Sequence, residues 1–291
     1  MGKKYEFKKG YRNDAIMRQR YNKLIGEAFS LNFENWYQNG YWTDKFNPYS
    51  LLDGEEMVST ISVNQMDFEW NGKIRHYIQL GGVTTKESCR KQGLSRFLMM
   101  KVLEEYQREA DGIYLFANHT VLDFYPKFGF KKAVEWQYFK TVQIEGKRTA
   151  KQVPMKEKKD WDVVEQAIKE SASNSVIELK HNSELIMFYL TQFMQENVFY
   201  IEEQDAYVVA ELDGSQLIVQ GVYSKNRVVL DEIYRAFGSE IKAVVLGFVP
   251  WDKEHYEKRA LSNEDDTLFV MGEDFNLFAE KQLAFPMLSR A

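Results

Sequence analysis

One short pattern occurs in both halves of the chain, and it constrains the fold more than any other feature. Residues 78–85 (IQLGGVTT) and 217–224 (LIVQGVYS) are apolar strand patterns that share a Gly-Val step near their ends. A segment of helical periodicity and then a short apolar strand follow each of them. Repetition of this order indicates a tandem duplication, so we expect two domains of similar fold with weak internal similarity.

The length of 291 residues suits two domains of ordinary size. Hydrophobic residues make up 44% of the chain and charged residues 28%, a composition typical of globular proteins with a sizeable core. Residues 146–160 are charged, contain Gly146 and Pro154, and include few apolar side chains. We therefore predict one domain over residues 1–145, a linker over 146–160 and a second domain over 161–291.

The periodicities of the first half predict an α/β domain of the α+β kind, in which helices flank a mixed and largely antiparallel sheet. The turn residues Asn71 and Gly72 join two alternating strand patterns, and the apolar run at 113–117 is typical of a buried central strand. The expected helices are 17–29, 94–108 and 121–128, and the expected strands are 57–65, 73–83, 113–117 and 133–144.

The second half restarts the same order after the charged segment. An Asp213-Gly214 turn joins two strand patterns, and Ser183 is a suitable N-cap for a helix over 185–193. The other expected elements are helices at 163–168 and 228–237 and strands at 207–212, 216–223, 241–248 and 267–271.

Charge and composition exclude several classes of protein. The net charge of −5 argues against a nucleic-acid partner, which calls for a basic surplus. The single cysteine, Cys89, excludes an internal disulfide framework, and four scattered histidines form no metal-ligand pattern, so we expect no metal. No apolar run reaches about 18 residues and the N-terminus lacks a signal-peptide core. We expect a cytoplasmic protein with no membrane partner; its oligomeric state stays open, a homo-oligomer included.

The two halves differ in the loop between the repeated strand and its helix. The first half has eight polar residues there, 86–93 (KESCRKQG), whereas the second has only 225–227 (KNR). A helix N-terminus with a preceding glycine, here Gly93, can bind an anion through its free amides, and Arg90 and Arg96 add positive charge. The alternative is a charged turn in which the glycine only satisfies backbone geometry.

Two motifs in this region resemble those of a known family. Arg90-x-x-Gly93-x-Ser95 follows a strand and is similar to the R/Q-x-x-G-x-G/A motif of the GCN5-related N-acetyltransferases (GNAT). Residues 118–130 (NHTVLDFYPKFGF) resemble the N…FY-x-K-x-G-F segment of that family, at the expected distance. Ser95 replaces the usual second glycine or alanine, and Pro126 is unusual after the tyrosine.

The resemblance to GNAT enzymes covers roughly residues 10–145. The tandem arrangement, with a second copy that lacks the loop, resembles the multidomain "enhanced intracellular survival" type of acetyltransferase. It implies a working first domain and a degenerate second domain.

The resemblance also implies acetyl-CoA as the acyl donor, bound in a cleft between the strands that end near Thr85 and Ala117. Loop amides would hold the pyrophosphate, backbone groups at the end of the first strand would pair with the pantetheine arm, and Asn118 would bond that arm. The implied donor-binding residues are Val83, Thr84, Thr85, Arg90, Lys91, Gln92, Gly93, Leu94, Ser95, Arg96 and Asn118.

In such an enzyme the acceptor amine attacks directly, and the family pattern makes Tyr125 the candidate general acid for the departing thiolate. The alternative for Tyr125 is core packing among the phenylalanines around it. The general base is open: Glu27, Glu34 or a water chain would serve. In the tandem subgroup the C-terminal carboxylate reaches the active site, which makes Ala291 a candidate as well, with the apolar tail 283–288 docked toward the site.

Aromatic residues are 15% of the chain, and seven of them lie between Phe33 and Tyr49, next to the region that borders the acceptor in this family. We expect Trp36, Tyr41 and Trp42 to bind the acceptor, because aromatic faces attract ammonium groups. An inter-domain seam is the alternative. Other aromatics, Phe188 and Phe193 among them, occur at core-facing spacings and need no function.

These features predict an acetyl-CoA-dependent N-acetyltransferase that acts on a small-molecule or peptide amine. Two other functions stay open: a weakly catalytic CoA-binding sensor or interaction protein, and a tandem aminoacyl or acyl transferase with another donor.

Overall fold

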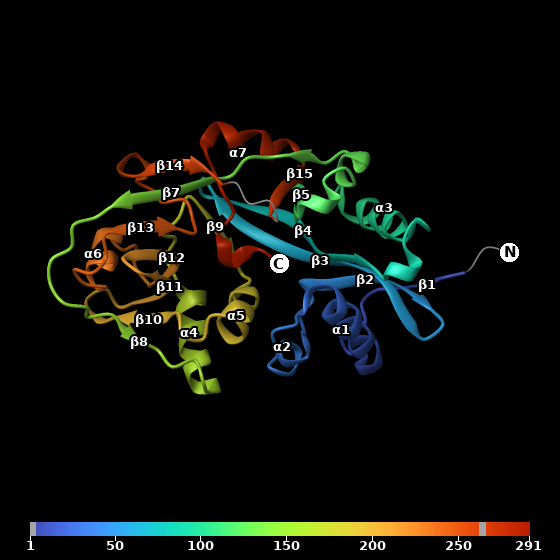
Figure 1. Ribbon diagram of the computed structural model, residues 1–291, viewed down its shortest axis with the longest axis horizontal. Coiled ribbons are helices and arrows are strands. Elements are labelled where there is room, and N and C mark those ends of the chain that lie inside the picture. Colours follow the sequence, from blue (N-terminus) through green and yellow to red (C-terminus); the bar gives the residue numbers. More distant parts are fainter. Residues whose placement is uncertain (1–3, 262–265) are drawn as a thin grey trace.

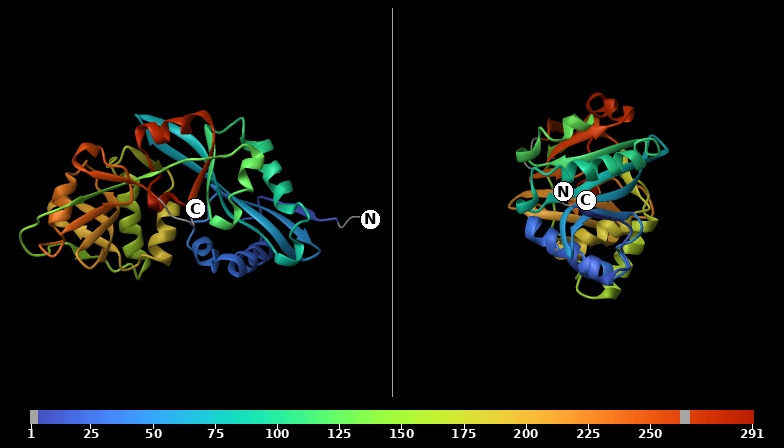
Figure 2. Two further views of the ribbon diagram at one scale, coloured as in Figure 1. Left: turned by 45° about the horizontal axis from the view of Figure 1, so that its top comes forward. Right: turned by 90° about the vertical axis from the view of Figure 1, so that its right-hand side faces the viewer.

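The computed structural model describes residues 4–261 and 266–291. Two mixed β-sheets lie along the long axis of the molecule, and the C-terminal segment lies between them (Figure 1 and Figure 2). This architecture confirms the predicted α/β fold class of two helix-flanked, largely antiparallel sheets. In the described ranges no helix is both long enough and apolar enough to cross a membrane.

The first sheet has the order β1-β2-β3-β4-β5-β15-β6, and β9 also pairs with β3. Among its described strands the only parallel pair is β4 with β5, between residues 77–80 and 112–115, and the other described pairs are antiparallel. Its strands are β1 (Glu6–Lys8), β2 (Phe46–Asp53), β3 (Glu56–Trp70), β4 (Lys73–Thr85), β5 (Gly112–Ala117), β6 (Lys131–Lys132), β9 (Ile177–Lys180) and β15 (Thr267–Met271).

The second sheet has the order β14-β7-β13-β12-β11-β10-β8. Here β12 and β13 form the only parallel pair within the described part of the chain, which repeats the arrangement of β4 and β5. Its strands are β7 (Trp136–Thr141), β8 (Lys151–Gln152), β10 (Val198–Ile201), β11 (Ala206–Asp213), β12 (Gln216–Tyr223), β13 (Ala243–Leu246) and β14 (Glu257–Ala260).

The two sheets exchange strands. The strand expected over 133–144 as part of the first domain is interrupted: β6 belongs to the first sheet, while β7 pairs with β13 and β14 in the second. In return, β15 of the second half pairs with β5 and β6. The charged segment 146–160 also contains β8 and the start of a helix. The division into a domain over 1–145, a linker over 146–160 and a domain over 161–291 therefore stays a prediction, because the two sheets do not follow these boundaries.

Helices cover the sheets on both faces. Figure 1 shows α3 on one face of the first sheet and α1 and α2 on the other. The Asp14 side chain fixes the start of α1, because it accepts hydrogen bonds from the amides of Ile16 and Met17 at 3.0 and 3.1 Å. The helices are α1 (Ala15–Phe29), α2 (Glu34–Gln38), α3 (Leu94–Tyr106), α4 (Lys158–Glu170), α5 (Ser183–Gln192), α6 (Leu230–Arg235) and α7 (Asn276–Lys281).

Two local expectations are wrong. The helix expected over 121–128 is a pair of short 3₁₀ turns, His119–Val121 and Tyr125–Phe128, because Gly129 adopts φ 95° and ends the second turn. Ser183 is not an N-cap: α5 begins at Ser183 itself, whose hydroxyl donates to Glu165 Oε1 at 3.4 Å.

The C-terminal tail contacts both sheets. Phe285 is buried and stacks on Tyr114 of β5, with ring centroids 4.0 Å apart and planes within 13°. A short 3₁₀ turn follows at Met287–Ser289, and the Met287 amide donates to the carbonyl of Gly247, just after β13, at 2.8 Å. The tail is thus held to the first sheet by ring packing and to the second by a backbone hydrogen bond.

Candidate functional site

The parallel strands β4 and β5 stop pairing after Leu80 and Leu115, and beyond this point β4 carries a bulge. Gly82 lies at the bulge with φ 53°, and a side chain there would press on Ser62 Oγ and Ile25 Cδ1, each 3.1 Å from its Cβ. The edge of β4 that faces β5 is therefore without a strand partner from the bulge onward. Such an edge can pair with an extended ligand.

The loop after β4 leads into an open helix N-terminus. Gly93 is the N-cap of α3 with φ 81°, no side chain caps the helix, and a Cβ on Gly93 would meet nothing within 4 Å. The amides of Leu94, Ser95 and Arg96 have no partner inside the helix, because they belong to its first turn. Lys91, at φ 62°, lies in the exposed loop before them. This arrangement can bind a phosphate group.

A chain of hydrogen bonds fixes this loop to the strands. The hydroxyls of Ser59 and Thr85 are 2.7 Å apart, and Thr85 is 2.7 Å from the hydroxyl of Ser95. Arg90 Nε donates to the carbonyl of Thr85 at 3.3 Å, and Gln92 Oε1 accepts from the Tyr5 hydroxyl at 2.6 Å. Arg90 and Gln92 thus hold the loop conformation, while Lys91 and Arg96 are the exposed cations beside the free amides.

Two expected site residues follow β5. Asn118 Oδ1 accepts hydrogen bonds from the amide and hydroxyl of Thr120, at 3.0 and 2.5 Å, so this oxygen caps the first 3₁₀ turn. Tyr125 is 4% exposed and belongs to the same apolar cluster as Leu94 and Ala117. Burial raises the pKa of Tyr125 to about 12, which keeps its hydroxyl protonated at neutral pH.

A cavity of about 350 Å³ opens on the opposite side of β4. Its walls come from α1, α2, β3, β4, α5 and the C-terminal tail, so both halves of the chain form it. The lining residues are Tyr21, Ile25, Phe29, Leu31, Phe33, Trp36, Phe46, Ser62, Asn64, Gly81, Gly82, Leu185, Phe188, Tyr189, Phe193, Arg290 and Ala291. We call it the aromatic cavity.

The tail brings Ala291 to the floor of the aromatic cavity. Its main-chain oxygen accepts a hydrogen bond from Gln79 Nε2 at 3.1 Å. It also lies so close to Gly81 that a Cβ there would be 2.6 Å from it. Ala291 therefore lies beside the point where β4 and β5 separate. The other candidate bases do not line this cavity. Glu34 pairs with Arg18, whose hydrogen bonds lower the pKa of the Glu34 carboxyl, and Glu27 is exposed.

Buried charges hold the tail in this position. Arg290 is 8% exposed, and its Nη2 lies 2.9 Å from Oε2 of Glu135, which is 3% exposed. Its Nη1 is 3.4 Å from Asp266 Oδ2, and its guanidinium lies 4.2 Å above the ring of Phe116. The Tyr189 hydroxyl donates to the carbonyl of Arg290. The sequence does not predict this cluster, because no local pattern links charges so distant along the chain.

The aromatic residues of the first half have two roles. Phe33, Trp36 and Phe46 line the aromatic cavity. Tyr41 and Trp42, 3% and 2% exposed, pack beside it without lining it. The ring of Phe33 stacks on Phe188 of α5 at 5.1 Å and 11°, and Trp36 Nε1 donates to the carbonyl of Glu184 at 2.8 Å. The cluster is both a cavity wall and a seam between the halves.

Two expectations about other aromatics need correction. The spacing of Phe188 and Phe193 predicts core residues without a function, yet both line the aromatic cavity, and Phe193 is 57% exposed.

Among the described residues, no group of three or more His, Cys, Asp and Glu side chains is arranged to hold a metal ion.

Residues 17–133 match the family model of the acetyltransferase (GNAT) domain. No curated protein sequence matches the chain. Among solved structures, a protein of Enterococcus faecalis V583 described as a "Probable N-Acyltransferase" is 14% identical at a TM-score of 0.62, over 96% of this chain and 75% of that one.

Two further structures share this fold at a TM-score of 0.57. A GCN5-related N-acetyltransferase from Kribbella flavida is 16% identical over 91% of this chain and 71% of its own. Eis1 from Mycobacterium abscessus is 12% identical over 91% of this chain and 72% of its own. At these identities the likeness concerns the fold.

Proposed function

We propose, from the match of residues 17–133 to the acetyltransferase (GNAT) domain model, that the protein is an acetyl-CoA-dependent N-acetyltransferase. One observation carries the proposal: the separating ends of β4 and β5 have an open helix N-terminus on one side and the aromatic cavity on the other. A donor and an acceptor could thus meet at one point. The second half, whose short 225–227 segment replaces the loop, would shape the acceptor site.

The residues present fit the donor. Acetyl-CoA supplies an acetyl group that is activated as a thioester. The pyrophosphate would bind the free amides of 94–96, with Lys91 and Arg96 adding charge, and the open space at Gly93 leaves room for close approach. The unpaired edge of β4 at 83–85 would hold the pantetheine arm. Asn118 would donate from Nδ2, because its Oδ1 is engaged by Thr120.

Two groups would move the protons. The amine nitrogen forms a bond to the acetyl carbon as the carbon–sulfur bond breaks. The α-carboxylate of Ala291 would accept the proton that the amine loses, and its contact with Gly81 and Gln79 supports this role. The Tyr125 hydroxyl, kept protonated by burial, would donate its proton to the sulfur. Holding both reactants in one cleft would supply much of the rate gain.

The acceptor would be a small-molecule or peptide amine. Aromatic rings line the aromatic cavity, and their faces attract ammonium groups. Trp36 lines the cavity and would contact the acceptor directly. Tyr41 and Trp42 are buried behind the lining and would hold the cavity wall in place.

Two measurements test the proposal. Acetyl-CoA should raise the melting temperature, because a ligand that binds only the native state stabilises it. Release of free thiol from acetyl-CoA should then depend on an added amine, in a panel of polyamines, aminoglycosides and peptides. A shift without release would favour a CoA-binding sensor. No shift at millimolar acetyl-CoA would contradict the proposal and leave another donor as the alternative.

A further inference from the structure

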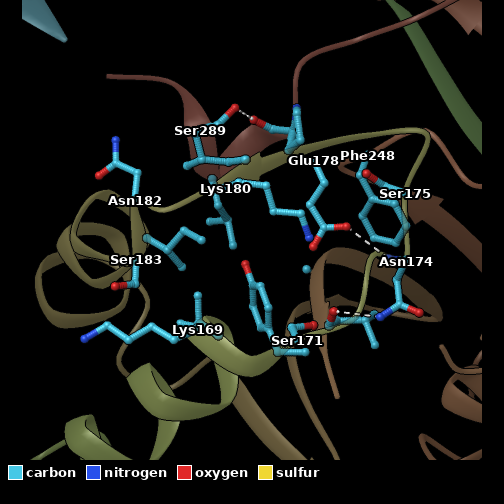
Figure 3. Close-up of a pocket in the computed structure, with 18 of the residues that line it drawn as sticks. Lys169, Ser171, Asn174, Ser175, Glu178, Lys180, Asn182, Ser183, Phe248 and Ser289 are labelled. Atoms are coloured by element: carbon cyan, nitrogen blue, oxygen red, sulfur yellow. Dashed lines mark hydrogen bonds between the residues drawn. The ribbon is translucent and has the colours of Figure 1, made fainter. Parts of the chain in front are cut away.

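A second cavity, of about 310 Å³, lies in the second half of the chain. The end of α4, the start of α5, β9, the end of β12 and the 3₁₀ turn of the tail form its walls, and polar side chains extend into it (Figure 3). It shares no lining residue with the aromatic cavity. We call it the polar cavity.

The polar cavity occupies the position in the second sheet where the first sheet has its site. The parallel pair β12–β13 ends at Val219 and Leu246, as β4–β5 ends at Leu80 and Leu115. β12 then carries a bulge at Gln220, next to a Gly-Val step that lines the cavity. Strand separation and bulge have thus been retained in the copy that lost the anion-binding loop.

Two lysines and two glutamates, Lys169, Lys180, Glu178 and Glu184, line the cavity, and one glutamate oxygen among them lacks a hydrogen-bond partner. Lys169 and Lys180 line it, but each has a carboxylate partner that does not: Lys169 Nζ is 2.5 Å from Glu165, and Lys180 Nζ is 3.4 Å from Glu69. The Glu184 carboxylate lies 4.0 Å from Lys45, and its Oε2 is buried without a hydrogen bond. A buried acceptor in this state is costly unless a ligand satisfies it.

Glu178 is the other acid that lines the cavity. Its Oε2 accepts from the Asn174 amide at 3.0 Å, a bond drawn in Figure 3. Burial raises the pKa of the Glu178 carboxyl, and the charge of Lys180 only partly opposes this. A bound cation would favour the ionised form.

Tyr223 supplies a free hydroxyl. The residue is 8% exposed and lines the cavity, and its hydroxyl has no hydrogen-bond partner within the described ranges. Tyr223 and Glu178 both line the cavity, and burial, together with the charge of Glu178, raises the pKa of the tyrosine. Gly221 permits this conformation, because a Cβ there would lie 2.7 Å from the Tyr223 oxygen. A tyrosine hydroxyl can both donate and accept a hydrogen bond, so this one is available to a ligand in the cavity.

We propose that the polar cavity binds a small organic ammonium compound, whose nitrogen donates to Glu178 while its polar part meets the Tyr223 hydroxyl. The Glu178 carboxylate and the buried Glu184 Oε2, which has no hydrogen-bond partner, select a ligand with a cationic donor, and the volume, at the lower end of ligand sites, selects a small one. The site is separate from the proposed acceptor site. Its occupant would contact Ser289, two residues before Ala291.

The test uses 1,4-diaminobutane as the probe and 1,4-butanediol as its uncharged counterpart, without acetyl-CoA, on the full chain. We expect the diamine, and not the diol, to bind in calorimetry and to raise the melting temperature. E178Q and Y223F should each raise the Kd of the diamine at this site at least tenfold. E203Q removes an equal charge from an exposed residue and should leave this Kd unchanged.

Binding that survives both E178Q and Y223F would assign the diamine to another site, such as the aromatic cavity, and would overturn the inference. Absence of any diamine binding would overturn it as well. If E178Q does not melt cooperatively, Y223F decides the outcome, because it removes one oxygen that makes no hydrogen bond in the described structure. None of these readouts requires acetyl transfer, so this inference and the proposed function fail independently.

Discussion

Gln79 Nε2 donates a hydrogen bond to the main-chain oxygen of Ala291 at 3.1 Å, across 212 residues of sequence. Gln79 belongs to β4 and is fully buried, and its Oε1 accepts from the Tyr114 hydroxyl of β5 at 3.1 Å. The two parallel strands thus fix the side chain that holds the tail. This links strand separation in the first sheet to the position of a residue from the other end of the chain.

Gly81→Ala should displace Ala291 and lower turnover. The added methyl would lie 2.6 Å from the Ala291 oxygen and 2.9 Å from its carbonyl carbon, which are backbone atoms that only a shift of the tail can move. We expect kcat to fall at least tenfold, with little change in acetyl-CoA affinity, in steady-state kinetics. Gly26→Ala is the control, since its methyl makes an ordinary 3.5 Å contact. Equal kcat in both variants would exclude Ala291 from the reaction.

Tyr125→Phe should lower kcat by about 10²–10⁴-fold, the contribution of a general acid, and leave acetyl-CoA affinity nearly unchanged. Tyr200→Phe, at a half-buried tyrosine of β10 whose hydroxyl donates to Asp205 Oδ1 at 2.9 Å, is the control. The pH profile gives a second readout. A donor acts while it is protonated, and burial raises the pKa of Tyr125 to about 12, so this group should cause no alkaline loss of kcat between pH 7 and 10. A kcat of Tyr125→Phe equal to that of Tyr200→Phe would contradict the assignment, and an alkaline loss that disappears in Tyr125→Phe would contradict the raised pKa.

Gly93→Ala should raise the Kd for acetyl-CoA and should cost only a small amount of folding stability. Its φ of 81° strains any residue with a Cβ, and the methyl would enter the open space beside the helix amides. Gly214→Ala carries similar strain, at φ 57° in the turn between β11 and β12. Both should lose about 1 kcal/mol of stability, and calorimetry should show a raised acetyl-CoA Kd only for Gly93→Ala. Equal Kd values would remove the loop from the donor site.

Sequence alone predicts the elements whose signals are local. The periodicity of α1 and α3 and the Asn71-Gly72 turn specify their own structure, and the loop at 90–96 lies within one motif. Strand exchange is not local: β7 and β15 have ordinary strand patterns, and nothing in such a pattern selects the sheet that a strand joins.

The same limit applies to the site. The proposed donor side comes from adjacent residues, so its motif can be recognised. The proposed acceptor side depends on α5, whose Phe188 and Tyr189 look like any core-facing aromatics until tertiary packing brings them to Phe33 and Arg290. The break at 133–135 within the expected strand has a comparable cause. It puts Glu135 into a buried pair with Arg290 rather than on a strand face.

Glu135→Gln tests whether this pair positions the tail. The substitution leaves a buried guanidinium with only Asp266 at 3.4 Å, and breaking a buried pair costs about 3–5 kcal/mol. The melting temperature should fall by roughly 6–12 °C for a chain of this size. Turnover should also fall, with acetyl-CoA affinity retained, because Arg290 precedes Ala291. Glu104→Gln breaks an exposed pair with Lys101 and should change neither quantity measurably. If Glu135→Gln and Glu104→Gln have the same melting temperature and the same kcat, the pair does not position Ala291.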